Sequence, residues 1–238
     1  MKIIAIDSSG MTASVAITED DITIAEYSVN YKKTHSQTLL PMLDEVSKMT
    51  ELDLNTVDAI AIAKGPGSFT GLRIGSATAK GLGFTLDKPI IEVYTTDALA
   101  YNMYGTDRIV CPLMDARREQ VYTGIYRFVR SGDGFDLETL LKPSALPVEE
   151  VVKKINELNE PVIYLGDGVP VYKDKLDALT KVDHVYAPSH RNRQSAASVG
   201  ALALKLYKAG RYVSSDDHVP EYLRLSQAER ERKEKEDT

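Results

Sequence analysis

The chain has 238 residues, of which 43% are hydrophobic and 27% are charged, a composition typical of a soluble globular protein. The formal net charge is −6, so the chain lacks the excess of basic residues that autonomous nucleic-acid binding requires. The single cysteine, Cys111, leaves no disulfide within the chain, and the apolar run before Asp7 is too short for a secretory leader or a membrane span. These features predict a cytoplasmic protein.

The first half alternates strand and helix patterns. In chain order, the expected elements are strands at 2–7, 12–18 and 22–29, a helix over 35–49, a strand at 57–65, a helix through 84, a strand at 89–95 and a helix over 97–104. The first three strands form a meander. Pro41 is tolerated in its helix only if the helix begins near Thr38.

The second half repeats this pattern more weakly. Its expected elements are two strands and a turn within 108–129, a strand near 135–141, a helix over 147–158 with Pro147 in its first turn, a strand and glycine turn at 161–168, and a helix over 195–210 capped by Ser195. The repeat predicts a duplicated α/β architecture. We expect lobes at 1–104 and 105–225, followed by a charged tail at 226–238.

The stretch KGPGSFTGLRIG (64–75) has four glycines in twelve residues and suggests a phosphate-binding loop. A Walker A loop that begins at Gly65 needs another glycine five residues later, where this chain has Thr70. The dinucleotide fingerprint fails at the same residue. Spacing therefore excludes both phosphate motifs.

Small residues recur along the helix expected after this turn. Gly71, Gly75, Ala79 and Gly83 follow one another at intervals of four and form a ridge almost without side chains. Each glycine costs a helix interior about 1 kcal/mol relative to alanine, so this helix needs contacts with other elements. Two hypotheses stay open: the ridge packs inside the lobe, for example against the helix over 38–49, or the two helices form a surface for a partner chain.

Acidic turn residues offer a second kind of site. The candidates for facing a nucleotide are Asp7, Ser8, Ser9, Asp115, Gly166, Asp167 and Gly168. Three carboxylates that meet in a cleft could bind Mg²⁺ and a nucleotide, as in two-lobed phosphotransferases. Aspartate and serine are also favoured in turns without any ligand, so both interpretations stay open.

Other catalytic patterns are missing. The histidines are His35, His184, His190 and His218. No two of them are four residues apart, so the sequence lacks an H-x-x-x-H metal site, and we expect surface or capping histidines. Ser68 lies outside a G-x-S-x-G motif and Cys111 lies in an apolar run, so no nucleophile is indicated. No metal site is predicted.

Several segments together resemble the TsaB family, also called YeaZ. They are KGPGSFTGLRIG, IDSS at the end of the first strand, HSQTLLPMLDEV, MDARREQVY (114–122), YLGDG (164–168) and YLR (222–224). The resemblance spans the chain and is densest before residue 124. It implies a two-lobe actin-like ATPase (ASKHA, ribonuclease H-like) α/β fold with a reduced second lobe.

The resemblance also implies a function. It indicates a non-catalytic scaffold or activator that pairs as a heterodimer with TsaD, which transfers the threonylcarbamoyl group to N6 of A37 in ANN-reading tRNAs and forms t6A. It further implies that TsaE joins a larger assembly and that tRNA is held mainly by the partner. No cofactor is expected in this chain: ATP or ADP could bind only in the complex. The chain alone could form a homodimer. The partner-binding helices map onto 38–49 and 70–84. The interface residues expected there are Leu39, Met42, Leu43, Val46, Gly71, Gly75, Ala79 and Gly83.

Two alternatives are kept beside this function. One is a small ASKHA-type kinase or ATPase that uses Asp7, Asp115 and Asp167. The other is a metalloprotease, for which the sequence offers no metal ligands.

Overall fold

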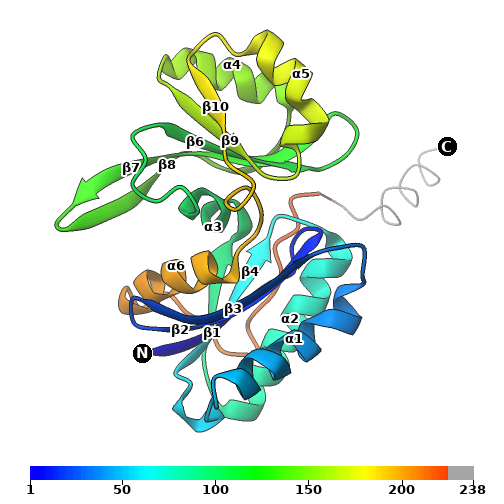
Figure 1. Cartoon of the computed structure of the whole chain (residues 1–238), viewed down its shortest axis with the longest axis vertical. Helices are drawn as coiled ribbons and strands as arrows, with labels where there is room; N and C mark the ends of the chain where they lie inside the picture. The colour runs from blue at the N-terminus through cyan, green and yellow to red at the C-terminus, as the bar shows by residue number, and fades with distance from the viewer. Residues whose placement is uncertain (225–238) are drawn as a thin grey trace.

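The structure is a computed structural model that describes residues 1–224, which form two stacked lobes (Figure 1). Each lobe is built around a five-stranded mixed sheet. The strand orders are β3-β2-β1-β4-β5 and β10-β9-β6-β7-β8. Each sheet therefore has a three-strand antiparallel meander followed by two parallel strands. The repeated topology confirms the predicted duplicated α/β fold.

The first lobe has helices on both faces of its sheet. The strands are β1 (Lys2–Asp7), β2 (Thr12–Glu19), β3 (Ile22–Asn30), β4 (Ala59–Gly65) and β5 (Ile90–Tyr94). Helices α1 (His35–Met49) and α2 (Phe69–Leu86) cover one face, α3 (Thr95–Tyr101) and α6 (Ala196–Lys208) cover the other, and a 3₁₀ helix η1 (Leu54–Thr56) precedes β4. The central strands β1 and β4 are apolar at almost every position because both of their faces are buried.

The second lobe has the smaller set of helices. Its strands are β6 (Ile109–Asp115), β7 (Gln120–Ser131), β8 (Gly134–Pro147), β9 (Val162–Leu165) and β10 (His184–Tyr186). Helices α4 (Val148–Leu158) and α5 (Val169–Leu179) cover one face. The other face packs against the end of α3, which lies between the lobes, and against Ala187. Helix α5 and strand β10 were not predicted.

The chain returns to the first lobe after completing the second. Ala196 and Val199 of α6 are fully buried against the first sheet, and beyond α6 the backbone of Val213 pairs with Ile90 at the edge of β5. The predicted second lobe, 105–225, is therefore wrong at its end, because residues from about 195 to 224 complete the first lobe. The predicted tail, 226–238, lies outside the described residues.

Two proline positions differ from the prediction. Helix α1 begins at His35, not near Thr38, so Pro41 lies inside it. The proline ring removes one hydrogen bond to the carbonyl of Gln37, and both residues lie on the exposed side of the helix, where solvent can replace that bond. Pro147 is the N-cap of α4 and not a first-turn residue. No helix within residues 1–224 is long and apolar enough to cross a membrane.

Candidate functional site

The first turn (residues 7–10) joins β1 to β2 and is buried. Asp7 is inaccessible to solvent. Its Oδ1 accepts hydrogen bonds from the Ser9 amide at 2.9 Å and the Ser9 hydroxyl at 2.6 Å, whereas its Oδ2 has no hydrogen-bond partner within residues 1–224. Burial raises the pKa of Asp7 to about 6, although the two bonds from Ser9 act to lower it.

The glycine ridge of α2 packs against this first turn. The Ser8 hydroxyl donates to the carbonyl of Gly71 at 2.8 Å. A Cβ at Gly71 would overlap the Ser8 carbonyl oxygen, and a Cβ at Gly75 would overlap the Ser8 hydroxyl. Glycine is therefore needed here because two backbone segments approach closely. The ridge continues with Ala79, which is fully buried.

The predicted interface residues are therefore corrected. A Cβ at Gly83 would lie 3.0 Å from the Lys88 carbonyl oxygen and 3.4 Å from Ile90, so the ridge faces its own lobe along its whole length. The four residues expected on α1 are also buried in the first-lobe core; they are Leu39, Met42, Leu43 and Val46. The ridge packs mainly on the first turn and the sheet, with contacts to α1 at His35 and in the core around Ala79. Any partner surface must use other faces of these helices.

The stretch that precedes α2 allows the backbone there to pack closely against the first turn. The Ser68 amide donates to the Ser9 carbonyl at 2.6 Å, and the Ser68 side chain caps α2 by accepting from the Gly71 amide at 3.3 Å. A Cβ at Gly67 would overlap the Ser9 carbonyl oxygen. Gly65 has a φ of 122°, a backbone conformation that residues with a side chain rarely adopt. The glycines thus join the first turn to the beginning of α2.

The second turn (residues 115–120) joins β6 to β7 and has the opposite character. Asp115 is exposed, and its Oδ1 accepts from the Arg117 amide at 2.8 Å and the Tyr172 hydroxyl at 3.2 Å. Arg117, Arg118 and Glu119 have φ values of 61°, 55° and 59°. Three consecutive side-chain-bearing residues in this left-handed region are strained, and such strain often accompanies a functional site.

The LGDG segment lies directly beside the second turn. The Gly168 amide donates to the Leu113 carbonyl at 2.9 Å, and Gly166 has a φ of 106°. Asp167 Oδ1 accepts from the Asp115 amide at 3.2 Å. Burial raises the pKa of Asp167, against the hydrogen bond from Asp115 that lowers it. The LGDG segment and the Asp115 turn, two of the three elements of the nucleotide-site hypothesis, are thus in contact.

A cleft of about 570 Å³ lies between the two turns. It is lined by Ser9, Gly10, Met11, Gly67, Ser68, Phe69, Thr70, Met114, Asp115, Ala116, Arg117, Tyr122, Asp167, Tyr222, Leu223 and Arg224. Asp115 and Asp167 reach the cleft, but Asp7 and Ser8 lie beneath the first turn and do not. The three predicted carboxylates therefore do not converge.

This arrangement limits the chemistry of the cleft. Within residues 1–224, no group of three or more His, Cys, Asp or Glu side chains is placed to hold a metal ion. The cleft offers the hydroxyls of Ser68 and Thr70, together with amides at the beginning of α2, so it can donate hydrogen bonds to a polar ligand. With the Asp7 carboxylate sealed, these residues do not fit a complete Mg²⁺–nucleotide site.

One histidine differs from the expected surface position. His218 is only 1% exposed; its Nδ1 lies 2.7 Å from Glu92 Oε1 and its Nε2 lies 2.9 Å from the Ser76 hydroxyl. The order serine–histidine–carboxylate resembles a hydrolase triad. Ser76 is only 5% exposed, however, and neither Ser76 nor His218 lines the cleft. The three residues are better explained as a buried connection between α2, β5 and residue 218.

The residues that sequence reasoning missed come from the end of the described chain. Tyr222 and Arg224 line the cleft, and Arg224 hydrogen-bonds to the second turn at the Ala116 carbonyl at 2.6 Å. The YLR motif was noticed as a similarity, but no pattern in the sequence connected it with residues 116 and 117. Only the folded chain brings them together.

Comparisons with known proteins agree with this architecture. A family model described as TsaD, tRNA N6-adenosine threonylcarbamoyltransferase, matches residues 23–232. The chain is 34% identical to the tRNA threonylcarbamoyladenosine biosynthesis protein TsaB of Bacillus subtilis (strain 168), with 96% of each chain covered. It is 30% identical to the protein of the same name from Escherichia coli (strain K12), over 94% of this chain and 95% of that one.

A solved structure matches in shape as well as in sequence. It is a Pseudomonas aeruginosa protein described as similar to the peptidase YeaZ, with a TM-score of 0.79 and 27% identity over 94% of this chain and 99% of that chain. Together with the repeated sheet topology, these matches confirm the predicted two-lobe actin-like ATPase (ASKHA) fold. The chain belongs to the TsaB (YeaZ) family.

Proposed function

We propose that the protein takes part in t6A formation as a non-catalytic subunit that pairs with TsaD. The names of its relatives support the pathway. The observation that carries the pairing is an exposed apolar surface on the outer faces of α1 and α2, which we call the helix-pair surface. TsaE would join the assembly, and tRNA would be held mainly by TsaD. We assign this role to the cytoplasm.

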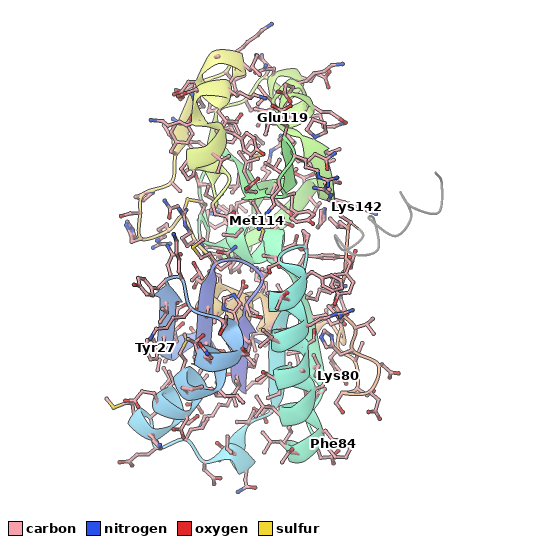
Figure 2. The ribbon with its side chains drawn as sticks, turned by 90° about the vertical axis from the view of Figure 1, so that its right-hand side faces the viewer. Tyr27, Lys80, Phe84, Met114, Glu119 and Lys142 are labelled. Carbon is pink, nitrogen blue, oxygen red and sulfur yellow. The ribbon has the colours of Figure 1, made fainter. Side chains whose placement is uncertain are left out.

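The helix-pair surface combines exposed apolar side chains with small residues. Leu40 of α1 is 57% exposed, and Phe84 of α2 is 75% exposed. Figure 2 shows α2 from this side, with Phe84 at its lower end. A Cβ at Gly81 would meet no atom within 4 Å, and neighbouring Ala77 is exposed. Such a surface allows close approach of another pair of helices.

The family match suggests what approaches this surface. The TsaD family model covers most of this chain, so TsaD and this protein share a sequence pattern. Two related chains can pair through equivalent surfaces about an approximate two-fold axis. The helix-pair surface would then meet its counterpart on TsaD. The same surface would allow a homodimer when TsaD is absent.

The non-catalytic role is supported by the cleft. Asp7 is sealed beneath the first turn. Of the remaining carboxylates, Asp167 accepts from the Asp115 amide and Asp115 accepts from the Arg117 amide and the Tyr172 hydroxyl. A kinase or ATPase that uses all three residues would need the first turn to open. We therefore assign nucleotide binding, if ATP or ADP participates, to the complex and not to this chain alone.

Complex formation tests the proposal directly. The chain is mixed with TsaD of the same organism, and the mass of the complex is measured by size exclusion with light scattering. We expect a heterodimer with the natural chain and loss of the complex with Gly81→Arg. The matched control is Val171→Arg on α5, an exposed apolar position of the second lobe, which should still pair.

A second measurement tests the non-catalytic role. TsaD is expected to modify tRNA only when this chain is added, whereas the isolated chain should neither modify tRNA nor hydrolyse ATP. Robust turnover by the isolated chain would overturn the proposal. Equal pairing by Gly81→Arg and Val171→Arg would disprove the helix-pair surface but leave the pathway intact.

A further inference from the structure

We infer that residues 213–224, which we call the strap, are a latch that holds the cleft between the lobes closed. The strap follows α6 and begins at the edge of the first sheet. There the backbones of Ile90 and Val213 exchange two hydrogen bonds of 2.9 Å. Figure 1 shows this segment, in orange, passing along the first lobe toward the second lobe. One end of the strap is therefore attached to the first lobe, and the other end reaches the second lobe.

The middle of the strap is fixed to α2 and β5. Buried His218 lies between Ser76 of α2 and Glu92 of β5, with contacts of 2.9 and 2.7 Å. Lys80 donates to the carbonyls of Asp216 and His218, each at 3.1 Å, and Figure 2 shows Lys80 on the strap side of α2. A segment without helix or strand is therefore held firmly to the first lobe.

The upper part of the strap is attached beside the glycine stretch. The Glu221 amide donates to the Lys64 carbonyl at 2.8 Å, and the two side chains form an ion pair at 3.2 Å. A Cβ at Gly65 would overlap the Glu221 carbonyl oxygen, so glycine at this position makes room for the strap. The Tyr222 ring packs on Phe69 with 4.6 Å between ring centres.

Arg224 then crosses to the second lobe. Its Nη1 donates to the carbonyl of Ala116 at 2.6 Å and to that of Arg117 at 3.5 Å. These acceptors belong to the second turn, whose left-handed residues persist only when their surroundings hold them. A charged donor on a backbone carbonyl is a strong contact. Arg224 therefore connects a segment fixed to the first lobe with the strained turn across the cleft.

The position of this contact determines its effect. Arg224, Tyr222 and Arg117 all line the cleft, so the contact lies at the cleft itself. Elsewhere the lobes are joined through α3, where the Tyr126 hydroxyl of β7 is hydrogen-bonded to Thr96 and Asp97. They are also joined through α6, where Lys205 donates to the Phe135 carbonyl and to Asp136 of β8. Release of Arg224 would leave the α3 and Lys205 contacts intact and allow the two turns to separate. Access to the cleft is thus controlled by one side chain.

Distances between the lobes test the latch on the whole chain. Spin labels are attached at Ser36→Cys on α1 and Asp174→Cys on α5, both exposed, while natural Cys111 is buried. Pulsed electron–electron double resonance then gives the distribution of distances between the two spin labels. We expect Arg224→Ala to lengthen and broaden it, and Arg224→Lys, which keeps one donor, to change it less. Arg130→Ala, an exposed arginine on β7, is the matched control.

Hydrogen exchange supplies a second readout. Amides of residues 116–120 are expected to exchange about tenfold faster in Arg224→Ala, because a hydrogen bond to a charged donor contributes about 1.5 kcal/mol or more. Identical distance distributions for the natural chain, Arg224→Ala and Arg130→Ala would overturn the latch. So would unchanged exchange in the turn. Neither measurement involves TsaD, so the latch and the proposed function succeed or fail separately.

Discussion

The first and second turns occupy equivalent places in the two lobes but have become physically different. Each follows the first strand of its sheet and begins with aspartate, Asp7 or Asp115. The first turn is buried, packed against the glycines of α2, and held by His35 Nε2 at 2.8 Å from the Gly10 carbonyl. The second is exposed, strained and held by Arg224. The two aspartates therefore keep equivalent positions in the two lobes, but only the exposed one, Asp115, can contact a ligand.

The largest expected effect comes from the packing of the first turn. Gly75→Leu would place a side chain against the Ser8 hydroxyl and Ile62, and overpacking of this kind costs about 3 kcal/mol. We expect a corresponding loss in the free energy of unfolding, measured with urea. Gly81→Ala, in the same helix but with open space around it, should instead gain about 1 kcal/mol.

A Gly75→Leu variant as stable as the natural chain would contradict the close packing of α2 on the first turn. The ridge would then not be constrained by the first turn. It would again be available for a partner.

The next effect concerns the buried carboxyl of the first turn. Its pKa is raised from 3.8 to about 6, so folding is opposed by ionisation. The penalty is absent below pH 4, grows between pH 4 and 6, and is complete above pH 6, where it amounts to about 3 kcal/mol. Asp7→Asn should therefore raise stability at pH 8 and leave it unchanged at pH 3.5.

Thermal unfolding at several pH values checks this expectation. Asp115→Asn is the matched variant of the exposed turn and should give no comparable gain at pH 8. A loss of stability in Asp7→Asn at pH 8 would mean that the ionised carboxylate is needed where it lies. The two turns would then be more alike than their burial suggests.

The smallest effect concerns the strain of the second turn. Arg118 has a φ of 55°, which costs a side-chain-bearing residue about 1 kcal/mol relative to glycine. Arg118→Gly is expected to stabilise the chain by up to about that amount, as measured with urea. Arg130→Gly, on the neighbouring strand, should destabilise it. Equal losses in both variants would show that the second turn stores no strain.

The sequence was sufficient to predict the elements whose burial follows a local pattern. The apolar runs of β1 and β4 and the helical spacing of α1 and α2 identified these elements correctly. The same spacing could not show which way a helix faces: Gly71 and Gly75 suit either a partner or the first turn, because both require close approach. The hydrogen bond between Ser8 and Gly71 joins residues that are 63 positions apart in the chain.

The site was less predictable for the same reason. Asp115 and Asp167 lie together because the strands that precede them, β6 and β9, pair in parallel, but the sequence offered their meeting only as one of two interpretations. The left-handed residues of the second turn contain no glycine, so composition did not indicate them. The buried position of His218 depends on Glu92 and Ser76, which are distant in sequence. Tertiary contacts, and not local propensity, determine these features.

The return of α6 to the first lobe also affects how the chain is made. The second lobe comes from one continuous segment, whereas the first lobe needs residues near its beginning and residues 196–224. A ribosome must synthesise the whole second lobe before α6 can cover the first sheet. Until then only α3 covers the face that carries Ile3 and Ala5. We therefore expect this face of the nascent chain to be the main surface that chaperones recognise.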